Sequence, residues 1–195
     1  MIRVFIGSIA AAVAMFVIGF VFYATPLANI HVGGLGDEEA AAIQSVLAAN
    51  MDASGADTVL VPYPDGEAQQ RMYIDGPIAM IHYNPSGFAL GDSGSLVGGF
   101  VHMLITAFLL GGALYSLAGH VRDFGARLSI IILFGIAASV FMHAGTPIWY
   151  HQDWTYHIYV AIADAVIFIA GGAVIAKWFL PNRIDSDDRF GEEKA

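Results

Sequence analysis

The chain has 195 residues, of which 57% are apolar and 13% are charged, and its net charge is −9. Soluble domains carry about 25% charged residues, so this composition excludes an ordinary water-soluble protein and indicates a membrane protein. The acidic balance argues against nucleic acid as a partner, and the absence of cysteine excludes disulfide bonds, thiolate metal sites and a cysteine nucleophile.

Four apolar stretches are long enough to cross a membrane, since a hydrocarbon core of about 30 Å needs roughly 20 helical residues. They lie at residues 4–23, 97–117, 128–144 and 158–180. The expected fold class is membrane all-α, a four-transmembrane-helix bundle with a small extracytoplasmic α+β insert between helices 1 and 2. The predicted parts are transmembrane helix 1 (1–24), the insert (25–96), transmembrane helices 2–4 (97–180) and a disordered cytoplasmic tail (181–195).

The first span resembles a secretory signal in one respect, because small residues, Ala24 and Ala28, follow it. Its apolar run is longer than the roughly 7–15 residues of a signal core. We therefore predict a retained membrane anchor, with cleavage as the alternative.

The basic residues predict the orientation of the chain. Seven of the eight lie on one side of the predicted spans, namely Arg3, Arg122, Arg127, Lys177, Arg183, Arg189 and Lys194. The positive-inside rule makes that side the cytoplasm. The predicted location is the bacterial inner membrane, multi-pass, with both termini inside and the insert in the periplasm.

The insert carries nine acidic residues and a single basic one, Arg71. Asp37, Glu38 and Glu39 precede a helix-forming run at 40–51, and acids are favoured at a helix start. Residues 58–61 and 78–83 have the β-branched and apolar character of two short strands. Because a unit of this size has only a small hydrophobic core, it is expected to rest on the membrane helices or on another protein. Its acids serve either solubility or the docking of a basic partner.

The stretch Gly91-Asp92-Ser93-Gly94-Ser95 is similar to the nucleophile loop of trypsin-like serine proteases. Such an enzyme needs a double β-barrel to align its nucleophile, base and oxyanion donors, and the insert is too short to form one. We interpret the stretch as a turn that enters the second span.

One cluster of polar residues is predicted within the spans. An ionisable side chain in a membrane costs about 2.5–3.5 kcal/mol on insertion scales, so Asp164 is expected to face protein and to find a partner. His157 lies on the same helical face as Asp164, while His102 and His143 lie near the same end of their own spans. If short hairpins make spans two, three and four neighbours, these four residues converge.

Three interpretations of His102, His143, His157 and Asp164 stay open. The first is a buried hydrogen-bond cluster in which His102 or His143 satisfies Asp164 and no cofactor is bound. The second is a metal site or a haem b site, since imidazole and carboxylate are suitable ligands; no ligand-spaced motif within one helix supports it. The third is a proton path in which Asp164 titrates.

Small residues predict where helices approach closely. Gly7 with Ala11 and Ser8 with Ala12 have small-xxx-small spacing, and glycine pairs lie at 111–112 and 171–172. The expected partners are the lipid bilayer and possibly another membrane-protein subunit. The expected function is that of a non-catalytic accessory, assembly or ligand-binding subunit. The alternatives are a membrane metal or haem redox protein and a minor transporter.

Overall fold

The computed structural model describes residues 2–52 and 54–180, so the predicted tail at 181–195 lies outside the described residues. The chain divides into two compact units. Residues 34–92, within the predicted insert, form one unit. The sequence on either side of them forms the other, which contains the long helices.

Within the described residues, four helices are long and apolar enough to cross a membrane, as the sequence predicts. They are α1 (Ile2–Tyr23), α4 (Ser93–Leu117), α5 (Phe124–His143) and α7 (Trp154–Val174). The last continues as a π-helix, η2 (Ile175–Phe179). Helix α7 begins earlier than predicted because the Asp153 carboxylate accepts hydrogen bonds from the backbone N–H groups of Thr155 and Tyr156. Helix α4 begins at Ser93, inside the protease-like stretch.

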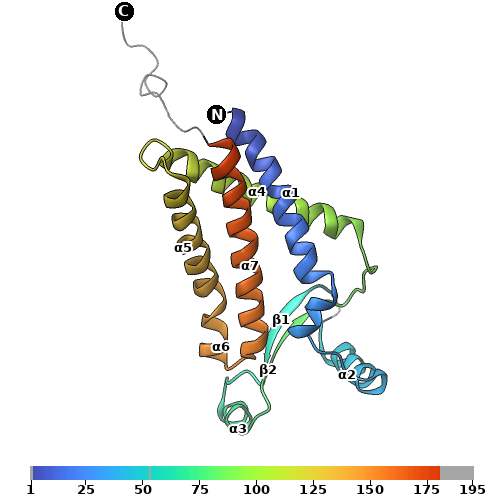
Figure 1. Ribbon diagram of the computed structural model, residues 1–195. Coiled ribbons are helices and arrows are strands. Elements are labelled where there is room, and N and C mark those ends of the chain that lie inside the picture. Colours follow the sequence, from blue (N-terminus) through green and yellow to red (C-terminus); the bar gives the residue numbers. More distant parts are fainter. Residues whose placement is uncertain (1, 53, 181–195) are drawn as a thin grey trace, which may run out of the picture. The chain divides into compact units, whose positions relative to one another are not determined.

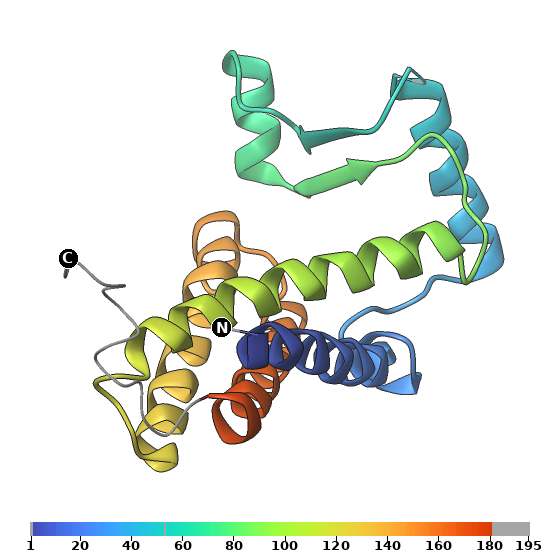
Figure 2. The same ribbon diagram turned by 90° about the horizontal axis from the view of Figure 1, so that it is seen from above.

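Helices α1, α7 and α5 lie side by side, and α4 crosses behind them at a steep angle (Figure 1). Helix α1 lies against both α4 and α7, and α7 lies against both α1 and α5. The expectation that spans two, three and four are neighbours is confirmed for α5 and α7 but is wrong for α4 and α5, which do not form a packed pair despite their short connection. Figure 2 shows the same helices seen from above. The first span occupies an interior position that hairpin reasoning did not assign to it.

Small residues let α7 approach its two neighbours. A Cβ atom on Gly171 would lie 2.5 Å from Met15 Sδ of α1, and one on Gly172 would lie 2.6 Å from Ile131 Cγ2 of α5. Adjacent glycines on α7 therefore receive side chains from opposite sides. Ser8 of α1 fits in the same way against Gly111 of α4. These contacts confirm the packing role predicted for Ser8, Gly111, Gly171 and Gly172, whereas a Cβ on Gly112 would meet no heavy atom within 4 Å.

At one end of the bundle the chain turns from α4 into α5. The Asp123 side chain caps α5 by accepting a hydrogen bond from Ala126 N at 2.9 Å. Arg127 is 3% exposed, and its guanidinium donates to Val121 O at 2.7 Å and to Ala118 O at 3.4 Å. A buried cation thus satisfies two carbonyl groups of the connection between α4 and α5.

The unit at 34–92 contains α2 (Asp37–Asn50), β1 (Asp57–Val61), α3 (Glu67–Asp75) and β2 (Ala79–Tyr83). The strands are antiparallel, with Asp57 opposite Tyr83 and Val61 opposite Ala79. Helix α2 and both strands confirm the predicted elements, whereas α3 was not predicted. None of the residues described in this unit is buried.

Two short helices complete the bundle. The 3-10 helix η1 (Pro26–Ile30) follows α1, and α6 (Gly145–Tyr150) follows α5. Helix α6 ends at His151, which adopts a left-handed conformation with φ 52°. Both short helices lie where α1 and α5 finish and α7 begins. We call this end of the bundle the histidine end, because His31, His143 and His157 belong to it.

Candidate functional site

The carboxylate of Asp164 lies in the third turn of α7 and binds two side chains from other helices. His143 Nε2, at the end of α5, lies 2.8 Å from Asp164 Oδ2. The Tyr23 hydroxyl, at the end of α1, donates to Asp164 Oδ1 at 3.0 Å. The three residues join α1, α5 and α7, and we call them the Asp164 clamp.

In the structure His143 of another long helix hydrogen-bonds Asp164, which is one of the two arrangements in the hydrogen-bond interpretation. The His143 side chain is 16% exposed and that of Asp164 is 38% exposed. The His143–Asp164 pair is therefore only partly buried. Tyr23 supplies the second donor, which sequence reasoning missed. A tyrosine that ends an apolar span has the pattern of an ordinary interfacial residue, so nothing in the sequence singled it out.

His31 forms an aromatic cluster beside the clamp. Its ring stacks on Tyr159 of α7 with centroids 4.3 Å apart and planes 3° from parallel, and it lies edge-on to Tyr23 at 6.0 Å. The Tyr159 hydroxyl donates to Phe22 O at 2.7 Å. These contacts hold the segment after α1 against α7. His31 was not predicted as a site residue, because its partners come from a helix more than a hundred residues away.

His157 lies in the first turn of α7 and is 9% exposed. Its Nε2 lies 3.2 Å from Gln152 Oε1. Since the amide oxygen accepts, Nε2 carries the proton and Nδ1 is a hydrogen-bond acceptor. Nδ1 is buried and has no partner in the described part of the chain. A buried polar atom left unpaired costs about 1–3 kcal/mol.

The structure brings His143 and Asp164 together, with His157 at the same end, but it does not bring His102 into the clamp. His102 is exposed on α4, which packs mainly on α1 rather than on α5 or α7. The four predicted residues do not all converge, because that prediction assumed that α4 packs against α5. Within residues 2–52 and 54–180, no group of three or more His, Asp or Glu side chains is arranged to hold a metal ion. The metal and haem b sites therefore remain predictions.

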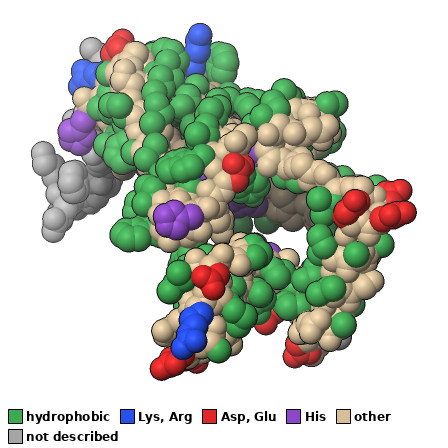
Figure 3. Space-filling view, turned by 90° about the horizontal axis from the view of Figure 1, so that it is seen from below, with side chains coloured by type: hydrophobic (Ala, Val, Ile, Leu, Met, Phe, Trp, Pro, Cys, Tyr) green, Lys and Arg blue, Asp and Glu red, His purple; other side chains and the backbone are tan. Residues whose placement is uncertain are grey.

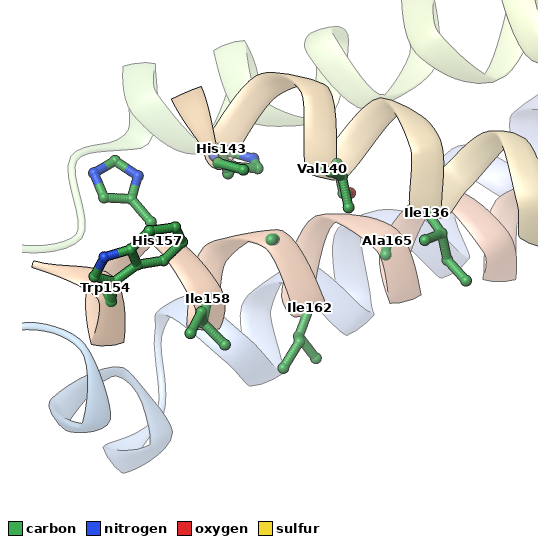
Figure 4. Close-up of a pocket in the computed structure, with 11 residues that line it drawn as sticks. Ile136, Val140, His143, Trp154, His157, Ile158, Ile162 and Ala165 are labelled. Carbon is green, nitrogen blue, oxygen red and sulfur yellow. The ribbon is translucent and has the colours of Figure 1, made fainter. Parts of the chain in front are cut away.

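A groove of about 260 Å³ runs between α5 and α7 (Figure 4). Its walls are apolar, with Ile136 and Val140 from α5 and Ile158 and Ile162 from α7. His143, His157 and Trp154 line one end of it. The only other polar side chain in the wall is Ser139. The groove thus combines a long apolar wall with two imidazoles at a single end.

Asp153 precedes α7 and caps it at the histidine end of the bundle. Hydrogen bonds from the backbone N–H groups of Tyr156 and Thr155 hold the pKa of its carboxyl below the usual value. The negative charge stabilises the start of α7, which carries Trp154 and His157.

The arrangement provides a clamp between three helices and a groove beside it. The clamp residues satisfy one another, as in a structural hydrogen-bond cluster, whereas the buried Nδ1 of His157 has no partner in the described part of the chain. Comparison with protein-family models, with curated proteins and with solved structures finds no match for this chain.

Proposed function

We propose that this protein is a non-catalytic accessory or assembly subunit of the bacterial inner membrane. In this proposal the four helices cross the membrane with both chain ends in the cytoplasm. The unit at 34–92 lies in the periplasm and docks a protein partner with a basic, partly apolar surface.

The observation that carries this proposal is the lack of a core in the unit at 34–92. None of its described residues is buried, and a stable domain normally buries most of its large apolar side chains. Ten such side chains are exposed: Leu35, Ile43, Val46, Val61, Tyr63, Met72, Ile74, Ile78, Phe88 and Leu90. So much exposed apolar surface is typical of an interaction surface.

Charge selects the kind of partner. The unit carries nine acidic residues, and its only basic residue, Arg71, is already paired with Glu67 at 3.4 Å. Figure 3 shows acidic side chains among apolar ones on one face of the molecule. A second copy of this chain would bring like charges together, which disfavours self-association through this surface. A basic partner complements the surface in both charge and apolar character.

Co-purification after gentle solubilisation tests the proposal. We expect a defined basic protein to co-purify in fixed ratio and to dissociate as salt is raised, since salt screens exposed charges. The double variant Glu38→Gln/Glu39→Gln should weaken the complex. The control Glu67→Gln removes an acid that Arg71 already neutralises and should leave the complex intact. A protein that always migrates alone, or only with copies of itself, contradicts the proposal.

Cysteine labelling tests the orientation, and the chain has no native cysteine that must first be removed. Ser86→Cys lies in the unit at 34–92 and Arg122→Cys in the connection between α4 and α5, both at exposed positions. A membrane-impermeant maleimide should label Ser86→Cys in intact spheroplasts and Arg122→Cys only after lysis. The reverse pattern would overturn the proposed topology.

A further inference from the structure

The unit at 34–92 contains a groove between α2 and β2. It measures about 690 Å³, within the range of about 300–1,000 Å³ for ligand clefts in proteins. One wall is α2 at residues 44–48, and the other is the end of β2 with the turn that follows, at residues 81–87. Unlike the groove between α5 and α7, this one is lined by many polar side chains: Gln44, Ser45, His82, Asn84 and Ser86. It can therefore accept polar groups as well as apolar side chains.

The lining residues place this groove at the edge of the sheet. Side chains of a strand point alternately to the two faces, so a groove over one face would be lined by every second residue and by β1 as well. Here three consecutive residues, Ile81, His82 and Tyr83, line the groove. No described residue of β1 does. The groove thus runs beside β2, on the side away from β1.

This edge of β2 has free hydrogen-bonding groups. The sheet consists of β1 and β2 alone, which Figure 2 shows as two adjacent arrows. In an antiparallel pair, alternate residues direct their N–H and C=O groups away from the partner strand. Within the described part of the chain, no backbone hydrogen bond other than those to β1 involves Ile81, His82 or Tyr83. At least one of these residues therefore directs an unpaired donor and acceptor away from β1.

Such an edge favours the addition of a third strand. An exposed strand edge is a template for pairing with another chain, and proteins usually protect it with charged residues or proline. Strand β2 reads Ala-Met-Ile-His-Tyr and contains neither. A sheet of two strands is only marginally stable in water, whereas three strands with an apolar face can be stable. An added strand would thus supply part of the stability that this unit lacks without a core.

The acids of α2 select the charge of that strand. A second hollow of about 400 Å³ continues along the helix, and Gln44 and Leu47 line both hollows. Asp37 lines the second, and Glu38 and Glu39 follow it in the first turn. Gln44 lies about 10 Å along the helix from Asp37 at helical rise, a distance that three or four extended residues cover. A strand in the groove can therefore carry basic side chains to these carboxylates.

We propose that an extended basic segment of a partner protein adds to β2 as a third strand, in the groove between α2 and β2. Backbone hydrogen bonds to β2 supply affinity, and alternate apolar side chains contact Leu47 and Ile81. The acids at the start of α2 attract the basic side chains. This proposal rests on the proposed function, because it specifies how the partner of the unit at 34–92 is bound.

Hydrogen–deuterium exchange of the full chain in nanodiscs of zwitterionic lipid tests the pairing. The probe is an acetylated peptide of seven residues in which lysine and valine alternate. We expect it to slow amide exchange at residues 81–83 and to leave exchange in α3 unchanged. The same peptide methylated at every backbone nitrogen keeps its side chains but cannot donate hydrogen bonds from its backbone. It should bind about ten-fold more weakly and should not slow exchange at 81–83.

A charge control uses the same peptide with glutamate in place of lysine, which should not bind because like charges repel. Two tryptophan substitutions in α2 then locate the site. Ala48→Trp places a large ring in the groove and should abolish the slowing at 81–83. Ala49→Trp is the matched control, because Ala49 is also exposed but is not among the lining residues. Exchange in β1 without peptide reports whether the sheet persists in each variant.

Slowed exchange at 81–83 that requires both the backbone donors and an open groove supports the proposal. Equal slowing by the methylated peptide, or no slowing by either, overturns it. Slowing that rises with protein concentration in the absence of peptide identifies a second copy as the occupant and also overturns it. If Ala48→Trp fails to fold, the comparison of the two peptides on the unsubstituted protein still decides.

Co-purification with Ala48→Trp separates this proposal from the proposed function. A basic protein that co-purifies equally with Ala48→Trp and Ala49→Trp would support the accessory role and overturn strand addition. Peptide pairing at β2 without any co-purifying protein would support the strand edge and contradict the accessory role.

Discussion

The Tyr23 hydroxyl donates a hydrogen bond to the Asp164 carboxylate at 3.0 Å, which joins residues 141 positions apart. Tyr23 ends the first long helix and Asp164 lies in the last. This contact therefore joins the first and the last of the long helices near the histidine end. Since His143 holds the other carboxylate oxygen, the third long helix is tied to the same point.

Removing the Tyr23 hydroxyl should weaken the bundle. We expect Tyr23→Phe to lower the free energy of unfolding by about 1 kcal/mol, a common value for a hydrogen bond between helices in membranes. Thermal unfolding in detergent measures the change. The control is Tyr150→Phe at the exposed end of α6, which should have little effect. Equal losses in both variants would mean that the Tyr23 contact contributes nothing specific.

Alanine substitutions of Gly171 and Gly172 in α7 should reduce stability by different amounts. A Cβ on Gly172 would lie 2.6 Å from Ile131, which is branched close to its backbone and cannot move aside. Gly172→Ala is therefore expected to cost about 1–3 kcal/mol through overpacking. Gly171→Ala should cost less, because the flexible Met15 can change rotamer.

Gly112→Ala provides the matched control, since no heavy atom lies within 4 Å of a Cβ placed there. It should leave the unfolding temperature unchanged or raise it slightly, as alanine favours helix over glycine. If Gly172→Ala behaves like Gly112→Ala, α5 and α7 do not pack at this glycine.

The cap at Asp153 should make stability depend on pH. Its pKa is lowered in the folded protein, so its contribution is present above the unfolded pKa of about 3.9 and is lost as the pH falls through the lower, folded pKa. Asp153→Asn still caps the helix but does not titrate. The difference in unfolding temperature between wild type and Asp153→Asn should change below about pH 4 and stay constant above about pH 6. A difference that is constant down to acidic pH would show that Asp153 does not contribute.

Substitution of Arg127 should reduce stability more than substitution of Arg122, although both residues lie near the connection between α4 and α5. Arg127 is buried and donates to two carbonyl groups, so Arg127→Ala is expected to cost about 1.5–3 kcal/mol. Lysine cannot reproduce the fork of the guanidinium, so Arg127→Lys should recover only part of the loss. Arg122 is exposed, and Arg122→Ala should lie within about 0.5 kcal/mol of wild type. Chemical or thermal unfolding of the three variants measures these differences.

A visible absorption spectrum and metal analysis of the purified protein test the metal and haem b predictions. We expect no Soret band and no stoichiometric metal, because both carboxylate oxygens of Asp164 accept hydrogen bonds and His102 lies outside the clamp. A Soret band that disappears in His143→Phe would instead establish haem ligation at this end.

The sequence predicted the long helices well because length and apolar content determine them. The four apolar stretches became α1, α4, α5 and α7 with ends shifted by a few residues. Asp164 stood out for the same reason, since a carboxylate in an apolar span requires a partner. The glycines and small residues also marked real contacts, as Gly172 against Ile131 illustrates.

The neighbours of each helix could not be predicted. In a soluble helix the apolar face marks the side that packs, but a membrane helix is apolar on all sides. Connection length then remained as the guide, and it wrongly paired α4 with α5. Tyr23 and His31 were missed as a direct result, because both belong to the segment that only an interior α1 brings to Asp164 and Tyr159.

The position of α7 between α1 and α5 has a consequence for biogenesis. Ribosomes deliver α5 before α7, yet α5 packs on α7 and its π-helical continuation rather than on α4. During synthesis α5 is therefore made before its neighbour, while α1 and α4 can already associate. A nascent chain interrupted before Trp154 would contain the α1–α4 pair and an unpaired α5. The Tyr23 hydroxyl and the His143 ring would both lack their common partner, the Asp164 carboxylate.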